Sequence, residues 1–379
     1  ALILILFSTF LNANEKIVLQ LKWFHQFQFA GYYAAKEKGF YDEVGLNVEI
    51  RQRDLKYNNI DEVINGNAQY GVADSILILY RLKQQPVVIV SPIFQHSPSV
   101  FISLKKSNIS SVYELNNKDI LFYPNDTDGF SLLAMIKKFD LDVNLVRERY
   151  KDDYMRLINN EVDVMPAYIA NEPFLFKEKG YDVNIINPTN YGFDMYGDML
   201  FTNEDEAKNN PIRVEKFKEA TLKGWKYALE NKEEIIQLIN EKYSKEKSIE
   251  HLRYEANAID SLINKDVTPL GYLDQGRIRY ISEMYEYYGL TESKIDLNDF
   301  LFDEISKKDK KLSLSDEEIK YLKDNPILKV HNFDSLPPYN FTLNNYPKGF
   351  VIDYIQLVSK VLGVKIEFIQ NKSLKESVD

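Results

Sequence analysis

The chain contains no cysteine among its 379 residues, and it has only four histidines. Without thiols it cannot form a disulfide framework, a thiolate metal site or a cysteine nucleophile. None of the histidines has a serine or aspartate partner in a hydrolase-like pattern; they are His25, His96, His251 and His331. The sequence therefore predicts no catalytic residue, no metal site and no cofactor.

Basic stripes and membrane-spanning apolar runs are missing as well. The net charge is −10 and the lysines are scattered among acidic residues, which argues against a nucleic-acid partner. The apolar run at residues 1–13 is too short to cross a bilayer and ends in a small residue, as the apolar part of a signal peptide does. We expect an exported chain that is truncated at its start and cleaved near Ala13. A buried N-terminal strand is the alternative, and the polar residues that follow the run disfavour it.

The chain is organised around residues 23–46, which hold an aromatic loop and a helix. Residues 17–22 alternate apolar and polar side chains, which predicts a half-buried strand before the loop. Apolar spacings of three and four predict a helix from Ala30 onward, and Gly39 stands where a left-handed cap residue is expected. Residues 46–50 alternate again, so the predicted order is strand, loop, helix, strand.

The aromatic loop occupies the place where ligands collect in α/β sheets, at the carboxyl end of a strand and beside a helix N-terminus. Its rings offer stacking area, and its amides can orient a flat polar molecule. Trp23 is one of two stacking candidates, the other being Tyr196 in a later loop, and His25 and Gln28 are polar candidates. The alternative is a core role for Trp23 and Phe27 and a hydrogen-bonded structural histidine at position 25. The clustering of these residues at a strand end favours a ligand site.

Polar residues also follow two later strands. Asp74 and Ser75 come between the predicted strand 69–73 and a helix, so ligand contact and helix capping compete, and the cap is favoured for Asp74. Gln95 and His96 interrupt a long apolar stretch and need hydrogen-bond partners there. A ligand or the neighbouring backbone can supply those partners.

A second α/β pattern starts after Lys105 and contributes the remaining candidates. Its first loop contains Asn125. Glu172 stands at the predicted N-terminus of a helix, where a carboxylate is stabilising and a structural role is sufficient. The loop 187–198 combines turn formers with three rings, which is unusual for a solvated loop, although the rings can also pack against the domain. The ligand-binding candidates in this loop are Tyr191, Asp194, Tyr196 and Asp198.

Beyond residue 202 the sequence is mainly helical, and we assign Trp225 to the core. Residues 306–325 are highly charged and predict a linker with a short helix, whose N-terminus has a capping box that starts at Ser315. Residues 326–379 then begin a new strand–helix–strand unit, which stops before it could bury a core of its own.

Residues 17–302 resemble the thiamine-pyrimidine family of periplasmic binding proteins and synthases. The residues that carry the resemblance are Trp23, Ala30–Gly31, Ala34, Lys38–Tyr41, Gly45–Leu46 and Gly71–Ala73. The sequence is more similar still to a branch fused to bacterial membrane sensors, over residues 86–98, 171–180, 187–202, 217–231 and 251–259. Residues 326–379 resemble the opening of a second solute-binding family, typified by polar amino acid receptors, at Pro337–Tyr339 and Gly349–Asp353.

The resemblance implies an α/β fold, the two-lobed periplasmic-binding-protein fold of type II, followed by a truncated second binding-protein domain. The binding domain would span residues 14–305. Lobe one would comprise residues 15–104 and 203–302, and lobe two would comprise residues 105–202. A ligand that contacts both lobes would shift the population towards a closed form. The expected ligand is a pyrimidine-like or other small polar or aromatic compound.

The same resemblance includes an enzyme, because a eukaryotic branch of the family makes the pyrimidine of thiamine from bound pyridoxal phosphate. That branch needs a Schiff-base lysine, a histidine and a cysteine-rich iron site, and its lysine and histidine fall at Ala73 and Leu77 here. Because a Schiff base requires an amine at that place, we expect a binding protein rather than an enzyme.

Two functions follow from the resemblance. The favoured one is the periplasmic sensing region of a bacterial membrane receptor with histidine kinase or diguanylate cyclase output, because transport receptors normally carry one binding module rather than two. Such a receptor would be tethered to the membrane through its missing C-terminal region, with a signalling homodimer as a possible assembly. The alternative is the substrate-binding component of an ABC importer for a thiamine precursor or a related small molecule.

Overall fold

The computed structural model of the chain describes residues 14–123, 129–147, 154–309, 315–332, 335–343 and 346–370. Backbone contacts divide the chain into two units, and the boundary along the sequence lies between Ser306 and Lys307. The predicted signal segment 1–13 and the candidate Asn125 lie outside the described residues. Within the described ranges, no helix is both long and apolar enough to span a membrane.

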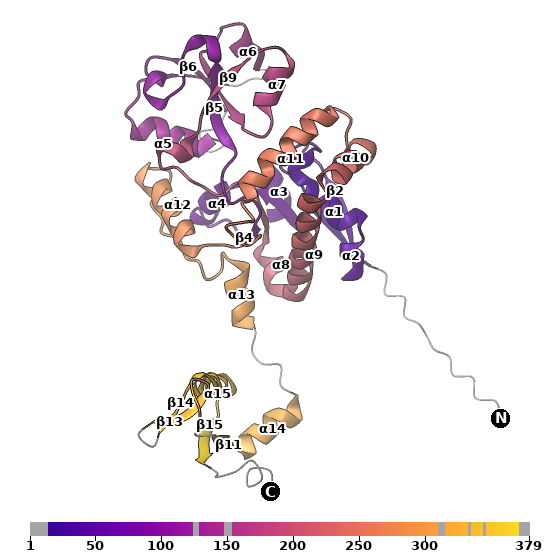
Figure 1. The fold of residues 1–379 in the computed structure, drawn as a ribbon, viewed down its shortest axis with the longest axis vertical. Helices are drawn as coiled ribbons and strands as arrows, with labels where there is room; N and C mark the ends of the chain where they lie inside the picture. Colours follow the sequence, from indigo (N-terminus) through magenta and orange to yellow (C-terminus); the bar gives the residue numbers. More distant parts are fainter. Residues whose placement is uncertain are drawn as a thin grey trace, which may run out of the picture. The chain divides into compact units, whose positions relative to one another are not determined.

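The first unit contains two five-stranded sheets, one in each of two lobes (Figure 1). The sheet of lobe one has the order β2-β1-β3-β10-β4. Its strands β2, β1 and β3 run parallel, so their carboxyl ends lie at one edge, whereas β10 runs antiparallel to both of its neighbours, β3 and β4. The strands are β1 (Glu15–Gln20), β2 (Leu46–Arg51), β3 (Tyr70–Ala73), β4 (Val87–Pro92) and β10 (Met199–Asn203).

Helices cover this first sheet. The predicted helix after the aromatic loop is confirmed as α1, which ends before Gly39, and Gly39 has the expected left-handed φ of 75°. Trp225 of α9 is fully buried, which confirms its assignment to the core. The helices are α1 (Ala30–Glu37), α2 (Phe40–Glu43), α3 (Asn59–Ile64), α4 (Ile76–Leu82), α8 (Glu204–Asn209), α9 (Pro211–Glu230), α10 (Lys232–Lys242), α11 (Ile249–Ile263), α12 (Gln275–Tyr287) and α13 (Phe302–Asp309).

The sheet of lobe two has the order β7-β6-β8-β5-β9. Its strands are β5 (Ser99–Leu104), β6 (Asp119–Phe122), β7 (Asn144–Arg147), β8 (Val164–Tyr168) and β9 (Val183–Ile186). The helices of this lobe are α5 (Phe130–Lys138), α6 (Tyr154–Ile158) and α7 (Glu172–Glu178). Strand β5 lies between β8 and β9 and runs antiparallel to both.

The strand pairing corrects the lobe boundaries that the sequence suggested. Residues 99–104 were expected in lobe one, yet they form β5 of the second sheet, and residues 199–202 were expected in lobe two, yet they belong to β10 of the first. The segments that cross between the lobes are therefore residues 93–98 and 187–198. The apolar pattern of both strands predicts burial, but it does not determine in which of two sheets a strand pairs.

The second unit contains a strand–helix–strand arrangement, as the sequence predicted. Strands β11 and β15 are parallel neighbours, and α15 connects them through Gly363, whose φ is 67°. The predicted capping box at Ser315 is also confirmed. The elements are α14 (Asp316–Asp324), β11 (Ile327–Asn332), β12 (Ser335–Leu336), β13 (Asn340–Leu343), β14 (Tyr346–Lys348), α15 (Phe350–Leu362) and β15 (Lys365–Gln370).

Candidate ligand-binding site between the lobes

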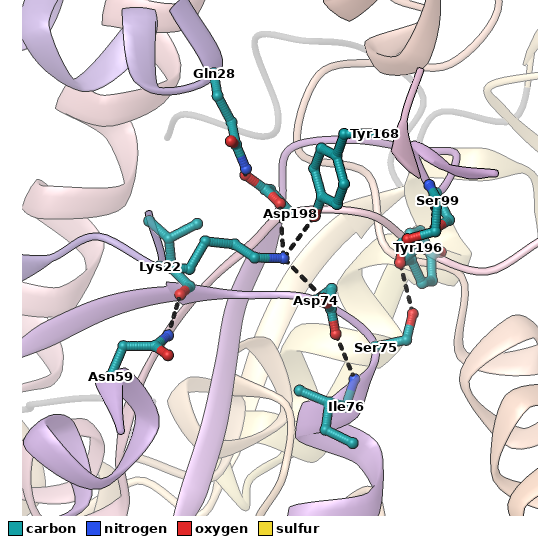
Figure 2. Close-up of polar contacts among 12 residues, drawn as sticks. Lys22, Gln28, Asn59, Asp74, Ser75, Ile76, Ser99, Tyr168, Tyr196 and Asp198 are labelled. Atoms are coloured by element: carbon teal, nitrogen blue, oxygen red, sulfur yellow. Dashed lines mark hydrogen bonds and ion pairs between the residues drawn. The ribbon is translucent and has the colours of Figure 1, made fainter. Parts of the chain in front are cut away.

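Lys22 lies at the centre of the contacts between the two lobes. It follows the carboxyl end of β1, beside the end of the parallel strand β3, and its ammonium group lies 2.7 Å from the Asp74 carboxylate. The same Nζ atom donates to the Tyr168 hydroxyl of lobe two at 2.8 Å and lies 3.3 Å from Asp198 Oδ1 in a crossing segment. Figure 2 shows Lys22 between these three partners. One side chain thus joins both lobes and the hinge.

The charges at this point stabilise one another. Burial by itself lowers the pKa of Lys22, but the attraction of Asp74, Tyr168 and Asp198 outweighs it and raises that pKa well above the ordinary value, so the ammonium keeps its proton. Asp198 is 1% exposed, and burial raises the pKa of its carboxyl group although Lys22 opposes the shift. The charged form of Asp198 therefore depends on Lys22 and its other neighbours for stabilisation.

Polar contacts continue from Lys22 around the interface of the lobes and close a ring. We call this set of eight residues the polar ring. In order, its members are Lys22, Tyr168, Glu172, Asn171, Lys247, Gln26, Gln28 and Asp198.

The lobe-two side of the polar ring lies at the N-terminus of α7. Glu172 accepts hydrogen bonds from the Tyr168 backbone N–H and from Asn171 Nδ2, each at 2.7 Å. Burial raises the pKa of the Glu172 carboxyl group, and the bond from the Tyr168 N–H partly opposes the shift. Asn171 directly precedes α7, but its side chain makes no capping bond and instead accepts from Lys247 Nζ at 2.6 Å.

The lobe-one side of the polar ring connects α11 to the aromatic loop. Lys247 donates to Asn171, to Gln26 and to the buried carboxylate of Glu255. Gln26 donates to Gln28, which donates to Asp198 Oδ2 at 2.7 Å. Burial raises the pKa of Glu255 although Lys247 opposes the shift. Both lysines therefore neutralise carboxylates that would be unstable alone in this position.

Beside the polar ring lies a cavity between the two lobes. Its volume is about 30 Å³, room for a group the size of one water molecule. Residues of lobe one, of both crossing segments and of lobe two line it, among them Asp74, Ser75, Ser97, Tyr196, Gly129 and Ser131. A ligand with an aromatic ring needs more space than this, so the lobes have to move apart to admit it.

Six of the predicted site residues meet at this interface. Gln28, Glu172 and Asp198 belong to the polar ring, and Asp74 is paired with its Lys22. Asp74 Oδ1 also accepts from Ile76 N at 3.0 Å, so the predicted helix cap and a place at the interface coexist. Ser75 and Tyr196 line the cavity and are bonded to each other through the Ser75 hydroxyl and the Tyr196 carbonyl at 2.6 Å.

The remaining candidates lie outside this group. Trp23 is 43% exposed and contacts Phe24 edge to face. His25 bonds the Tyr33 hydroxyl through Nδ1 at 2.8 Å, and burial, followed by the charge of Lys36, lowers its pKa.

Four further candidates have partners that hold the backbone or the crossing segments together. Gln95 donates to the Tyr272 carbonyl at 2.9 Å. His96 bonds Asp194 at 2.9 Å, which links the two crossing segments, and Asp194 also pairs with Arg277. The Tyr191 hydroxyl accepts from Val112 N within lobe two. These contacts give each of the four a structural role.

Sequence reasoning missed Lys22, Tyr168 and Lys247. A signal existed for Lys22, because it is the charged residue that ends the alternating segment just before the aromatic loop. Tyr168 directly follows the apolar stretch 164–167, which is typical of a buried strand, and ligands collect at the ends of such strands. Lys247 has no such signal, since it lies in a lysine-rich stretch that is indistinguishable from a solvated surface.

Two α/β lobes that are joined by two crossing segments make up the fold of periplasmic solute-binding proteins. The chain belongs to the NMT1/THI5-like family, whose model matches residues 26–235, more than half of the chain.

Two curated relatives are similar to about three fifths of the chain. The riboflavin-binding protein RibY of Chloroflexus aurantiacus is 26% identical over 236 residues, which cover 59% of this chain and 65% of RibY. The formylaminopyrimidine-binding protein of Halalkalibacterium halodurans is 23% identical over 233 residues, which cover 60% of this chain and 71% of that protein. The chain thus spans just under two thirds of the length of RibY.

Solved structures support the fold. The periplasmic aliphatic sulphonate binding protein SsuA of Escherichia coli superposes with a TM-score of 0.59 at 13% identity, covering 77% of this chain and 98% of SsuA. At this identity the likeness concerns the fold alone.

Proposed function

We propose that the chain is an extracytoplasmic receptor that binds a small molecule between its two lobes and closes over it. The observation that carries the proposal is the polar ring, in which two largely buried lysines of lobe one are bonded directly to lobe two through Tyr168 and Asn171. Buried charges are costly unless they are paired, so the closed form depends on these particular pairs. Opening of the lobes breaks pairs between them, and a ligand between the lobes therefore shifts the equilibrium between the open and closed forms. Binding, rather than catalysis, is its function.

The curated relatives favour the receptor of an ABC importer over the sensor. Their names assign them riboflavin and formylaminopyrimidine, both nitrogen heterocycles. We infer a ligand of the same general kind here, a thiamine precursor or a related planar compound. An importer receptor is exported, which agrees with the apolar N-terminal segment of the sequence.

A thermal-shift screen of pyrimidines, flavins, amines and amino acids tests the receptor function. A compound that binds only the folded protein raises the unfolding midpoint, and at a hundred times its Kd it adds about 2.7 kcal/mol of stability. If no compound of such a broad set raises the midpoint, the receptor function is wrong.

Trp23 is the proposed stacking residue of this site. It is an exposed ring next to Phe24, and the aromatic loop that contains it also supplies Gln26 and Gln28 to the polar ring. Trp23→Ala should weaken a ligand from the screen by about tenfold, since loss of an aromatic stacking contact costs about 0.5–1.5 kcal/mol beyond the lost area. Tyr57→Ala, which removes another exposed ring of lobe one, is the matched control. Equal affinities of both variants would remove Trp23 from the site.

A sensor region remains a second proposal because of the second unit. Its parallel strands β11 and β15 with the connecting helix α15 are the arrangement that opens an α/β domain. Recovery of the full gene distinguishes the two proposals: a membrane span and a kinase or cyclase domain downstream support the sensor, whereas neighbouring permease and ATPase genes support the importer.

A further inference from the structure

His251 is a buried histidine at a contact between the lobes that lies outside the polar ring. It stands in the first turn of α11 in lobe one and is 4% exposed. Its ring packs against the Phe174 ring of α7 in lobe two, with 4.9 Å between the ring centres, and Tyr254 packs on the same ring. Because the imidazole is covered from lobe two, opening of the lobes exposes it to water.

Three features keep the imidazole neutral in this contact. Its buried Nε2 atom has no hydrogen-bond partner in the part of the chain that the structure describes, so a proton there would be a buried donor without an acceptor. Burial lowers the pKa of His251 to about 4, and the charge of Lys247 contributes, whereas a hydrogen bond with the Asn171 backbone opposes the shift. The N-terminal end of α11 also disfavours a positive charge.

Charged groups face His251 from both lobes. From lobe two, the Glu178 carboxylate lies 3.8 Å from Nδ1 and favours a protonated ring. Its side chain is 39% exposed and accepts from the Ser248 hydroxyl at 2.9 Å, so solvent weakens its attraction. From the segment before α11, Lys247 disfavours the protonated ring. Burial and Lys247 outweigh Glu178.

We propose that His251 makes the closing of the lobes dependent on pH. Acid protonates the imidazole when the lobes are apart, and the protonated ring does not return to its place against Phe174. The open form therefore accumulates, and a bound ligand is released. This inference rests on the proposed receptor function and adds its regulation.

The size of the effect follows from the pKa of the imidazole in the two forms. In the open form the ring lies in water, where histidine has a pKa of about 6.5, against about 4 in the closed form. The contribution of His251 to closing is therefore intact above about pH 6.5 and is lost as the pH falls towards 4. Between about pH 7.5 and 5.5 the ratio of open to closed molecules should rise about tenfold through this residue.

Three acids near the contact of the lobes act in the opposite sense. Burial raises the pKa values of Glu172, Glu255 and Asp198, so a proton taken up by one of these groups favours the closed form. The contribution of His251 is therefore measured as the difference between the wild type and a variant that lacks the imidazole.

Fluorescence energy transfer between dyes on cysteines introduced at the exposed positions Lys106 and Lys226 measures the equilibrium without ligand. From about pH 7.5 to 5.5, we expect the ratio of open to closed molecules to rise about tenfold more in the wild type than in His251→Gln. His331→Gln removes an imidazole of the second unit and is the matched control, which should respond to pH as the wild type does.

Nuclear magnetic resonance of the histidine rings measures the protonation of His251 directly. The chain has four histidines, so the signal of His251 is the one that is missing from His251→Gln. We expect its titration midpoint to lie well below about 6.5 in the wild type. In Phe174→Ala, which removes the ring that covers the imidazole from lobe two, the midpoint should move towards that value. If His251→Gln does not fold, His251→Asn takes its place in both measurements.

The outcomes separate this inference from the receptor function. An equal response to pH in the wild type and His251→Gln, or a midpoint of about 6.5 in the wild type, overturns the role of His251 while the receptor function stands. The thermal-shift screen decides the receptor function separately when it is run at about pH 7.5, where the imidazole is neutral in both forms.

Discussion

Asp198 and Glu255 are buried acids and Glu172 is a partly buried one, and desolvation is the main cause that raises the pKa of each. Glu172 shows how such a group can be tolerated, since its carboxylate is held by the N–H of Tyr168 and by the amide of Asn171. A buried carboxylate with these partners remains less stable in its charged form than one in water. The stability of the protein therefore depends on the protonation of the polar ring.

The sign of this dependence can be tested at Glu172. Because its pKa is raised in the folded state, the folded protein holds a proton that the unfolded chain has already lost above about pH 4.5. The stabilisation is complete below that pH and is lost as the pH rises through the folded pKa. We expect the free energy of unfolding to fall more between pH 4.5 and 7.5 in the wild type than in Glu172→Gln, as measured by urea denaturation.

Glu233→Gln is the control for this comparison. Arg253 lowers the pKa of the exposed Glu233, so the contribution of Glu233 is lost only as the pH falls below its ordinary value. Between pH 4.5 and 7.5 the free energy of unfolding of Glu233→Gln should change with pH as that of the wild type does. If the free energy of unfolding of Glu172→Gln also follows the pH dependence of the wild type, the raised pKa of the Glu172 carboxyl group is contradicted.

At the scale of elements, the close contact of α1 with α9 holds the core of lobe one together. A Cβ atom at Gly224 of α9 would lie 2.2 Å from the Gly31 carbonyl oxygen and 2.6 Å from the Ala35 Cβ, and a Cβ atom at Gly31 would meet the ring of Trp225. Both glycines are needed because backbone and ring approach each other there without room for a side chain. This contact positions the start of α1 and, with it, the aromatic loop.

We expect Gly224→Ala to destabilise the protein by about 1–2 kcal/mol. Alanine favours a helix over glycine by about 1 kcal/mol, but overpacking against backbone atoms costs about 1–3 kcal/mol and requires the two helices to move apart. Glu219→Ala, at an exposed position of the same helix, should change stability by less than about 0.5 kcal/mol. The measurement is the urea midpoint; a midpoint at or above that of the wild type would show that α1 and α9 are packed less closely.

At the scale of the whole molecule, the equilibrium between the open and closed forms depends on the strength of the bonds between the two lobes. The hydrogen bond from Lys22 to Tyr168 crosses between them and has a charged donor, so its loss costs about 1.5 kcal/mol. Tyr168→Phe removes this bond and little else. We expect it to shift the equilibrium between open and closed forms about tenfold towards the open form and to weaken ligand binding by up to the same factor.

Fluorescence energy transfer between dyes on the two lobes measures this equilibrium. The chain has no cysteine, so cysteines introduced at the exposed positions Lys106 and Lys226 can be labelled specifically. Tyr191→Phe is the matched control, since the Tyr191 hydroxyl joins a crossing segment to Val112 of lobe two and makes no bond to lobe one that the structure describes, and it should leave the distance unchanged. Equal transfer in Tyr168→Phe and the control would show that this bond does not hold the lobes.

The sequence by itself determined the elements and the kind of fold. The alternation of apolar and polar residues located β1 and β2, and apolar residues spaced three and four apart located α1, whose end Gly39 marked. These features could be predicted because they are local and depend only on neighbouring residues. The strand–helix–strand unit after residue 326 was predicted for the same reason. Asp74 was found because the strand ends of an α/β sheet share an edge, and Asp198 was found because its loop combines turn formers with aromatic rings.

Only the tertiary structure decided which residues meet. Strands β5 and β10 each pair in antiparallel orientation with strands that are distant in the sequence, β8 and β4 respectively. No local pattern could therefore assign β5 or β10 to a lobe. The partners of the polar ring lie up to 221 residues apart, as with Gln26 and Lys247, and a lysine that neutralises a buried acid looks in the sequence like any surface lysine. Burial and pairing of charges arise from the contact of the two lobes, and that contact gives Lys22 its place at the centre of the site.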